Sequence, residues 1–216
     1  MKRPGIPKPT SSIDIRRDVP VAQLAAIGAV HLEWNRVERG LDWALLRALD
    51  LPWSDWTDVV SRISGVAAKI EILKNAANTG AAHSQRGIIT ETLGGAASLK
   101  PYRDAIAHAV LFDASVPIGI AWQYQARITE ILLTPAALNA LCDRLTLVHQ
   151  ELGMVVQIFY YVHVTNGMCR TDSSGLDQEQ AASLLAEIPV KLSALQAKRR
   201  ALPPLPDFPP EVLPRD

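Results

Sequence analysis

Cysteine and net charge are what this sequence has least of. Its 216 residues contain two cysteines, Cys142 and Cys169, and 22 basic side chains balance 22 acidic ones. Two cysteines without metal-ligand spacing predict neither a disulfide framework nor a zinc site, and they favour a reducing compartment. Because the formal charge is zero, no global field attracts nucleic acid or an anionic membrane, so binding of RNA or DNA would require a local patch.

Long apolar runs are also missing. No segment approaches the roughly 20 apolar residues of a membrane span. The basic start Met1-Lys2-Arg3 is followed by Pro4 instead of the apolar core of a signal peptide. We therefore expect no membrane association and a cytoplasmic location. Hydrophobic and charged contents of 48% and 20% are those of a globular protein of one domain or slightly more.

Apolar residues that recur at three- and four-residue steps predict helices in the first half of the chain. A long helix is expected from Pro20 to about Asp50, with Gly40 as a kink or break. Ser54 or Asp55 is expected to cap a second helix that ends near Thr79-Gly80. A third helix should begin between 83 and 90, with Gly94-Gly95 as an interruption. Pro101 would then lie in the first turn of the following segment.

The second half begins with a change of period. Apolar residues alternate from Ile118 to Ile128, which predicts a small β-hairpin or strand insertion around 117–133. Thr134-Pro135 is typical of a helix start, and the helix should run to about His163. A last helix should begin near Asp177. Pro189 should kink or divide it, and the cations Lys198-Arg199-Arg200 suit the negative end of its dipole.

These elements predict a mainly α-helical protein, an up-down bundle of four to five helices with one small β insertion. We divide the chain into four segments: an irregular N-terminal arm (1–19), the bundle (20–163), a loop and C-terminal helix packing on it (164–200), and a proline-rich tail (201–216).

The segment Tyr102 to Ala109 concentrates the acid–base side chains. Asp104 and His108 are four residues apart, so on a helix they share a face, and the carboxylate can orient the imidazole. Arg103 lies five residues before His108, about 140° away around the axis. One helix therefore does not aim both side chains at one atom, whereas two copies meeting at a two-fold axis could place two arginines and two histidines in one groove.

This set of groups suits cleavage of RNA. A histidine can move a proton to or from the 2′-hydroxyl or the leaving oxygen. Arginine matches the planar, bidentate geometry of a phosphate and stabilises the charge that develops on it. With the 2′-hydroxyl as nucleophile, no metal is needed, and we expect neither a metal nor a cofactor.

The segment Arg103-Asp104-Ala105-Ile106-Ala107-His108 resembles the Arg-x4-His motif of HEPN domains, a helical-bundle family found in many toxin and abortive-infection ribonucleases. Asp104 fills the polar position after the arginine, whereas Ala109 replaces the common glycine. The resemblance covers residues 20–163, including helical segments around Trp34 and Lys69 and the Leu133-Thr134-Pro135 helix start.

This resemblance implies a metal-independent endoribonuclease with catalytic residues Arg103, Asp104 and His108. It further implies an RNA substrate, a homodimer with a composite active site, a toxin or phage-defence role and an inhibitory protein partner. The alternative is a catalytically inactive binding module on the same bundle, in which the polar cluster stabilises a dimer.

Several other residues invite a functional interpretation and are better explained structurally. Arg144 and His149 repeat the Arg-x4-His spacing, but within a leucine-rich stripe. The tryptophans could stack bases, but in a small bundle they are more typical of core or interface anchors. Lys69, Lys74 and Lys100 could form a local basic surface for RNA or a solvated helix face. The remaining histidines are expected to be structural: His31, His83 and His163.

Overall fold

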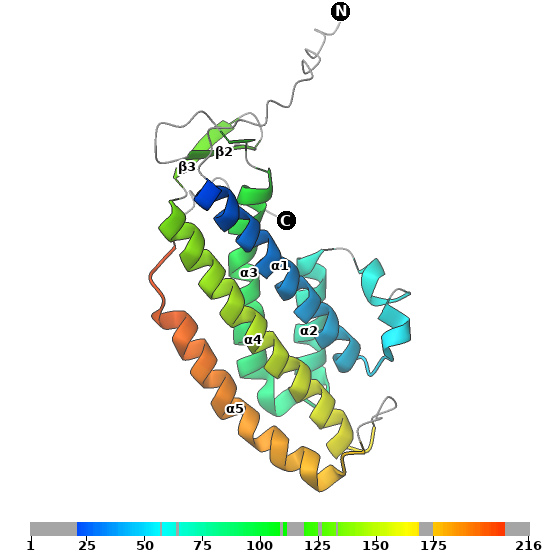
Figure 1. Cartoon of the computed structure of the whole chain (residues 1–216). Coiled ribbons are helices and arrows are strands. Elements are labelled where there is room, and N and C mark those ends of the chain that lie inside the picture. The colour runs from blue at the N-terminus through cyan, green and yellow to red at the C-terminus, as the bar shows by residue number, and fades with distance from the viewer. Residues whose placement is uncertain are drawn as a thin grey trace, which may run out of the picture.

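A computed structural model describes residues 21–205 of the chain, except 57, 64, 109, 112–118, 125–126, 133 and 169–174. This part of the chain is mainly helical (Figure 1). Its five α-helices are α1 (Val21–Ala48), α2 (Val66–Thr79), α3 (Arg86–His108), α4 (Pro135–Thr165) and α5 (Gln178–Ala201). Short 3-10 turns form η1 (Trp53–Trp56), η2 (Val60–Arg62) and η3 (His83–Gln85).

The order of the helices departs from a simple up-down bundle. Figure 1 shows α1, α2 and α4 running in one direction, and α3 and α5 in the other. The side chains agree for α1 and α4, since Thr146 bonds Glu33 and, further along both helices, Leu152 packs at Gly40. The connection from 49 to 65 is responsible, because it turns the chain back along α1 before α2 begins near Asp42, with which Lys69 of its first turn pairs. The expected succession of antiparallel neighbours therefore fails between α1 and α2.

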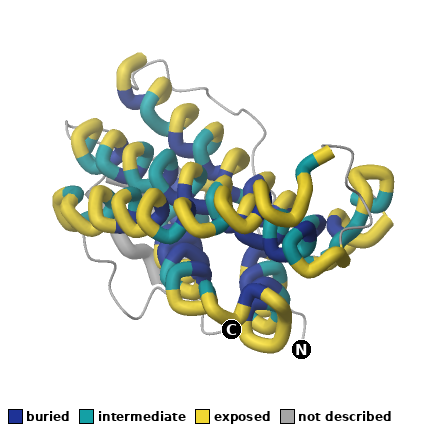
Figure 2. Tube along the Cα trace, turned by 90° about the horizontal axis from the view of Figure 1, so that it is seen from below, coloured by how far each residue is buried: buried dark blue, intermediate teal, exposed yellow. Residues whose placement is uncertain are grey.

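The core lies between α1 and α4, with α2 and α3 behind them, and Figure 2 shows buried segments on the inward sides of the helices. On α4 the apolar residues at three- and four-residue steps from Leu138 to Val162 are buried. On α1 the buried stripe runs through Val30, Trp34, Val37, Leu41 and Leu45, whereas Leu24 and Leu49, near the two ends of the helix, are exposed. The buried stripe of α1 therefore covers the middle of the helix, and apolar side chains near its two ends remain in contact with water.

Gly40 neither kinks nor breaks α1, contrary to expectation. It is buried within the continuous helix, and a Cβ there would stand 3.2 Å from Cβ and Cδ1 of Leu152. The absence of a side chain at Gly40 therefore gives Leu152 of α4 room to pack against α1.

Replacing Gly40 by alanine is expected to destabilise the fold by about 1–3 kcal/mol through overpacking against Leu152. Gly28 on the same helix is the matched control. It is exposed, with no atom within 4 Å of a built Cβ, so Gly28→Ala should stabilise the helix by about 0.5–1 kcal/mol. Urea unfolding of both variants measures the difference. Equal shifts of the same sign would mean that Gly40 is not a contact point.

The second helix begins later than its expected cap. Ser54 and Asp55 lie in η1, where the serine hydroxyl donates to Asp55 Oδ1 at 3.0 Å instead of capping a helix. α2 starts at Val66 after Gly65, whose φ of +87° is a conformation that glycine adopts without strain. Its end at Thr79, with Gly80 as C-cap, agrees with the expectation.

Three short strands connect α3 to α4. They are β1 (Val110–Leu111), β2 (Gly119–Tyr124) and β3 (Arg127–Leu132), which form an antiparallel sheet in the order β1-β2-β3. In the register of β2 and β3, Ile120 pairs with Ile131 and Trp122 with Thr129. Figure 1 shows these strands at the end of the bundle where α1 begins and α3 ends.

The last two helices start as their sequences indicate. The Thr134 hydroxyl accepts from the amide of Ala137, and Pro135 occupies the first helical position of α4. Asp177 and Gln180 form a reciprocal capping box at the start of α5. α5 is not divided at Pro189, and it packs along α4 on the outside of the bundle (Figure 1).

Candidate functional site

The candidate catalytic residues occupy the last two turns of α3. This helix is unbroken from Arg86 to His108. The expected interruption at Gly94-Gly95 and the expected new helical segment at Pro101 are therefore wrong. A proline inside a helix costs about 3 kcal/mol. Burial on both sides of it outweighs that cost, since Leu99, Ala105 and Ile106 all pack in the core.

Arg103 lies at the surface between α3 and α1. Its Nη1 donates to Asp104 Oδ1 at 3.0 Å, and its guanidinium carbon is 5.8 Å from the ring centroid of Trp34. Its side chain is 28% exposed, which leaves part of the guanidinium accessible. A guanidinium that rests on an indole face is held in place without losing its capacity to bind an anion.

Asp104 is shared between two cations. Lys100, one turn earlier, donates from Nζ to Asp104 Oδ2 at 2.6 Å, and Arg103 takes the other oxygen. Two cations around one carboxylate leave the cluster with a net positive charge, which suits a phosphate. The spacing of Lys100 and Asp104 could have revealed this ion pair in the sequence, because residues four apart on a helix are neighbours.

His108 is the last residue of α3, so its backbone follows Asp104 by one helical turn. Its side chain lies outside the part of the chain that the structure describes. The expected contact between the Asp104 carboxylate and the imidazole therefore stays a prediction. The structure brings Arg103 and Asp104 together directly and adds Lys100 and Trp34, which the sequence interpretation had not assigned to this site.

Trp34 belongs to the core and supports Arg103 from beneath. Its ring is 1% exposed, and its Nε1 donates to Glu38 Oε1 at 2.6 Å, one turn along α1. Because this indole is anchored at both its face and its edge, it fixes the position of the guanidinium. A base-stacking role for Trp34 is excluded by its burial.

The second Arg-x4-His segment has the structural role expected of it. Arg144 donates from Nη2 to the carbonyl of Leu202 at 2.9 Å and from Nη1 to that of Arg199 at 3.3 Å. These bonds satisfy carbonyls at the C-terminus of α5. His149 is turned toward Gly40, its Nδ1 3.7 Å from a Cβ built there, inside the interface of α1 and α4.

Arg199 does more than complement the dipole of α5. Its Nε donates to Glu151 Oε1 at 2.7 Å, and this carboxylate is fully buried. The guanidinium lies against Gly95, where a Cβ would come within 2.7 Å of it. Burial raises the pKa of Glu151 above its ordinary value, although the Arg199 contacts oppose the shift. The pair joins α4 to α5 and was missed because nothing in the sequence shows which arginine turns inward.

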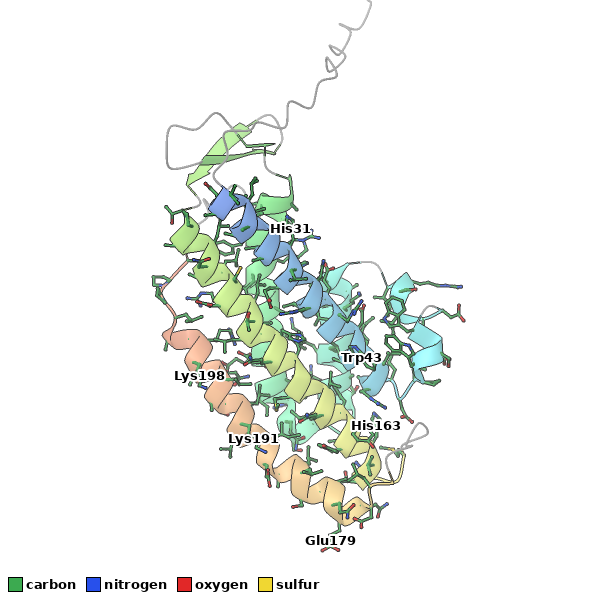
Figure 3. All side chains as sticks on the ribbon, in the orientation of Figure 1. His31, Trp43, His163, Glu179, Lys191 and Lys198 are labelled. Atoms are coloured by element: carbon green, nitrogen blue, oxygen red, sulfur yellow. The ribbon has the colours of Figure 1, made fainter. Side chains whose placement is uncertain are left out.

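Among the side chains that the structure describes, the cysteine and the other histidines do not form a cluster with one another or with nearby carboxylates that could hold a metal. Burial raises the pKa of Cys142 to about 11, with Glu33 and Asp143 adding to the shift, so its thiol stays protonated near neutral pH. Figure 3 shows His31 and His163 at opposite ends of the bundle. His83 Nδ1 lies 2.8 Å from the carbonyl of Asn78. Within the described residues, no group of three His, Cys, Asp or Glu is placed to hold a metal ion.

Comparison of the chain with family models, with curated proteins and with solved structures found no match. In the described part of the chain, none of the helices is both long and apolar enough to cross a membrane.

Proposed function

We propose that this chain is a metal-independent endoribonuclease of the HEPN type, whose active site is completed across a homodimer interface. The observation that carries the proposal is the unbroken end of α3. It places Arg103, Asp104 and His108 on consecutive turns of one helix, with the Arg103 guanidinium partly exposed beside Lys100. A toxin or phage-defence role in the cytoplasm and an inhibitory protein partner belong to the same proposal.

Each residue has a separate task in this reaction. Arg103, held on Trp34, binds the scissile phosphate and stabilises the charge that develops on its oxygens. His108 moves the proton between the 2′-hydroxyl, the leaving oxygen and water. Asp104 holds Arg103 and Lys100 in place, and because a carboxylate oxygen accepts more than one hydrogen bond, it can also orient His108.

Helix geometry favours a site that is shared with a second chain. Residues 103 and 108 are about 140° apart around the axis of α3, so their side chains leave one helix in different directions. A two-fold axis beside the end of α3 brings the arginine of one chain opposite the histidine of the other.

The purified chain is expected to be a dimer and to cleave single-stranded RNA in EDTA. Because the 2′-hydroxyl is the nucleophile, the 5′ fragments should carry 2′,3′-cyclic phosphates. Light scattering gives the mass, and gel analysis with mass spectrometry gives the fragment ends. A strict monomer, or fragments that carry only 5′-phosphates and 3′-hydroxyls, would contradict the proposal.

The alternative function is an inactive binding module on the same bundle. The observation in its favour is that both Asp104 oxygens are already occupied by cations, as in an ion-pair cluster that only stabilises a surface. A folded dimer that binds but never cleaves RNA in the same assay would favour this function over the nuclease.

A further inference from the structure

A hollow of about 520 Å³ lies between α1 and η1. It is lined by one face of α1 and by a tryptophan of η1: Leu32, Asn35, Arg36, Glu38, Arg39, Asp42 and Trp56. This volume is within the range of pockets that hold small organic ligands. Arg103 is not among the lining residues, so the hollow is distinct from the cluster around Asp104.

One wall of the hollow is the end of an aromatic stack. Trp43 and Trp53 stack with ring centroids 4.4 Å apart and an angle of 16°, and Trp53 and Trp56 with 5.7 Å and 22°. Trp53 therefore lies between the other two rings, and Figure 3 shows Trp43 on the side of α1 that faces the 3-10 turns. Trp56 is the member of the stack that lines the hollow, so a planar base in the hollow can pack against its ring.

The charges around the hollow single out Arg39. Arg36 donates to Glu33 Oε1 at 2.6 Å, Glu38 accepts from Trp34, and Asp42 accepts from Lys69 of α2. Of the charged lining residues, all of which the structure describes, Arg39 is the one without a hydrogen-bond or ion-pair partner. An exposed, uncommitted guanidinium beside an aromatic wall suits a ligand that carries a phosphate.

We infer that this hollow is a nucleotide site, in which a base stacks on Trp56 and the phosphate binds Arg39. The Asn35 amide and the Glu38 and Asp42 carboxylates supply donors and acceptors for the base edge or the ribose hydroxyls. The same chemistry fits a free mononucleotide or one nucleotide of an RNA strand. Binding of an RNA strand rests on the proposed function. It is favoured because the hollow is close to the candidate catalytic cluster: Glu38 lines the hollow and accepts a hydrogen bond from Trp34, whose ring lies beneath the Arg103 guanidinium.

The first test is equilibrium dialysis of the full chain against labelled 5′-AMP. Trp56→Leu is expected to weaken binding by about 5- to 150-fold, the range of one lost base–aromatic stack. Because Trp56 also packs against the core, Arg39→Ala at the exposed position serves as the second variant, with about tenfold weaker binding expected. The exposed Arg62 does not line the hollow, so Arg62→Ala should bind as the wild type does.

A 2′-O-methyl oligoribonucleotide, which lacks the attacking hydroxyl, separates the two sources. If it displaces AMP and depends on Trp56 and Arg39, the hollow holds part of an RNA strand. If AMP binds and the oligonucleotide does not compete, the ligand is a free nucleotide. No AMP binding near ~1 mM, or binding that Trp56→Leu and Arg39→Ala leave unchanged, overturns the inference. AMP binding is measured without RNA cleavage, so the two proposals can fail separately. A protein that cleaves RNA but does not bind AMP refutes only the nucleotide site, and one that binds AMP but does not cleave RNA refutes only the nuclease.

Discussion

His108→Ala is expected to slow RNA cleavage by about 10²–10⁴-fold, because a positioned general acid–base contributes a factor of that size. Arg103→Ala should lose about 10²–10³-fold, since a removed charge-stabilising donor typically costs that much. Neither substitution should unfold the protein, as Arg103 is partly exposed and His108 ends its helix. Initial rates on a fluorogenic RNA, with thermal unfolding of each variant, measure both effects.

Arg86→Ala is the matched control for these variants. Arg86 is an exposed arginine at the opposite end of the same helix, so its loss removes one positive charge from α3 without touching the site. Its cleavage rate should equal that of the wild type. Wild-type rates in both Arg103→Ala and His108→Ala would end the catalytic interpretation and leave the binding module.

Mixing the two inactive variants tests whether the site is shared between chains. A heterodimer of an Arg103→Ala chain with a His108→Ala chain contains one intact arginine and one intact histidine, on different subunits. Activity should reappear on mixing if the working pair is formed across the dimer. A mixture that exchanges subunits but stays inactive would place both groups of each site in a single chain.

Arg199→Ala is expected to destabilise the fold by about 3–5 kcal/mol near pH 8, because it leaves the Glu151 carboxylate buried without its partner. Urea unfolding gives the free energy directly. The neighbouring Arg200 pairs with Glu91 at the surface and is 58% exposed, so Arg200→Ala should cost about 0–1 kcal/mol. Replacing both buried partners, as in Glu151→Leu with Arg199→Met, should be neutral or stabilising by about 1–4 kcal/mol. Equal losses of unfolding free energy from Arg199→Ala and Arg200→Ala would show that the buried Arg199–Glu151 pair contributes no more to stability than the surface pair.

The pH dependence of stability gives the sign of the Glu151 shift. Because burial raises its pKa in the folded state, its contribution is fully present below the ordinary value of 4.5 and is lost as the pH rises through the higher folded pKa. Glu151→Gln cannot titrate, so the wild type should lose stability relative to this variant as the pH rises from 4 to 8. If the wild type instead becomes more stable relative to Glu151→Gln as the pH rises, the effect of Arg199 on the pKa of Glu151 is larger than that of burial.

Local signals in the sequence were sufficient for much of the helical structure. Thr134-Pro135 and Asp177 mark helix starts because side-chain oxygens there bond free amides within three residues. The leucine spacing of α4 describes its buried stripe, because that helix is packed along its whole length. Such information is contained within a few neighbouring residues, so no knowledge of the rest of the fold is needed.

Glycine and proline were misleading where packing outweighed local preference. Gly40 and Pro101 each suggested a break, yet both lie inside continuous helices. Gly40 packs against Leu152, and Pro101 is flanked by buried residues of α3. The parallel course of α1 and α2 was equally hidden, because it depends on the path of the connection between them. Propensities of about 1–3 kcal/mol per residue are small beside the burial of a helix face.

The candidate site divides in the same way. The grouping of Arg103, Asp104 and His108 on one helix follows from their spacing alone, since a helix relates residues at fixed angles whatever surrounds it. The Lys100–Asp104 pair also follows from its four-residue spacing, whereas the tertiary structure decided that Trp34 supports Arg103 and that Arg199 turns toward Glu151. The Trp34–Arg103 and Glu151–Arg199 contacts each join two different helices, and only the packing of those helices brings the partners within a few ångströms of each other.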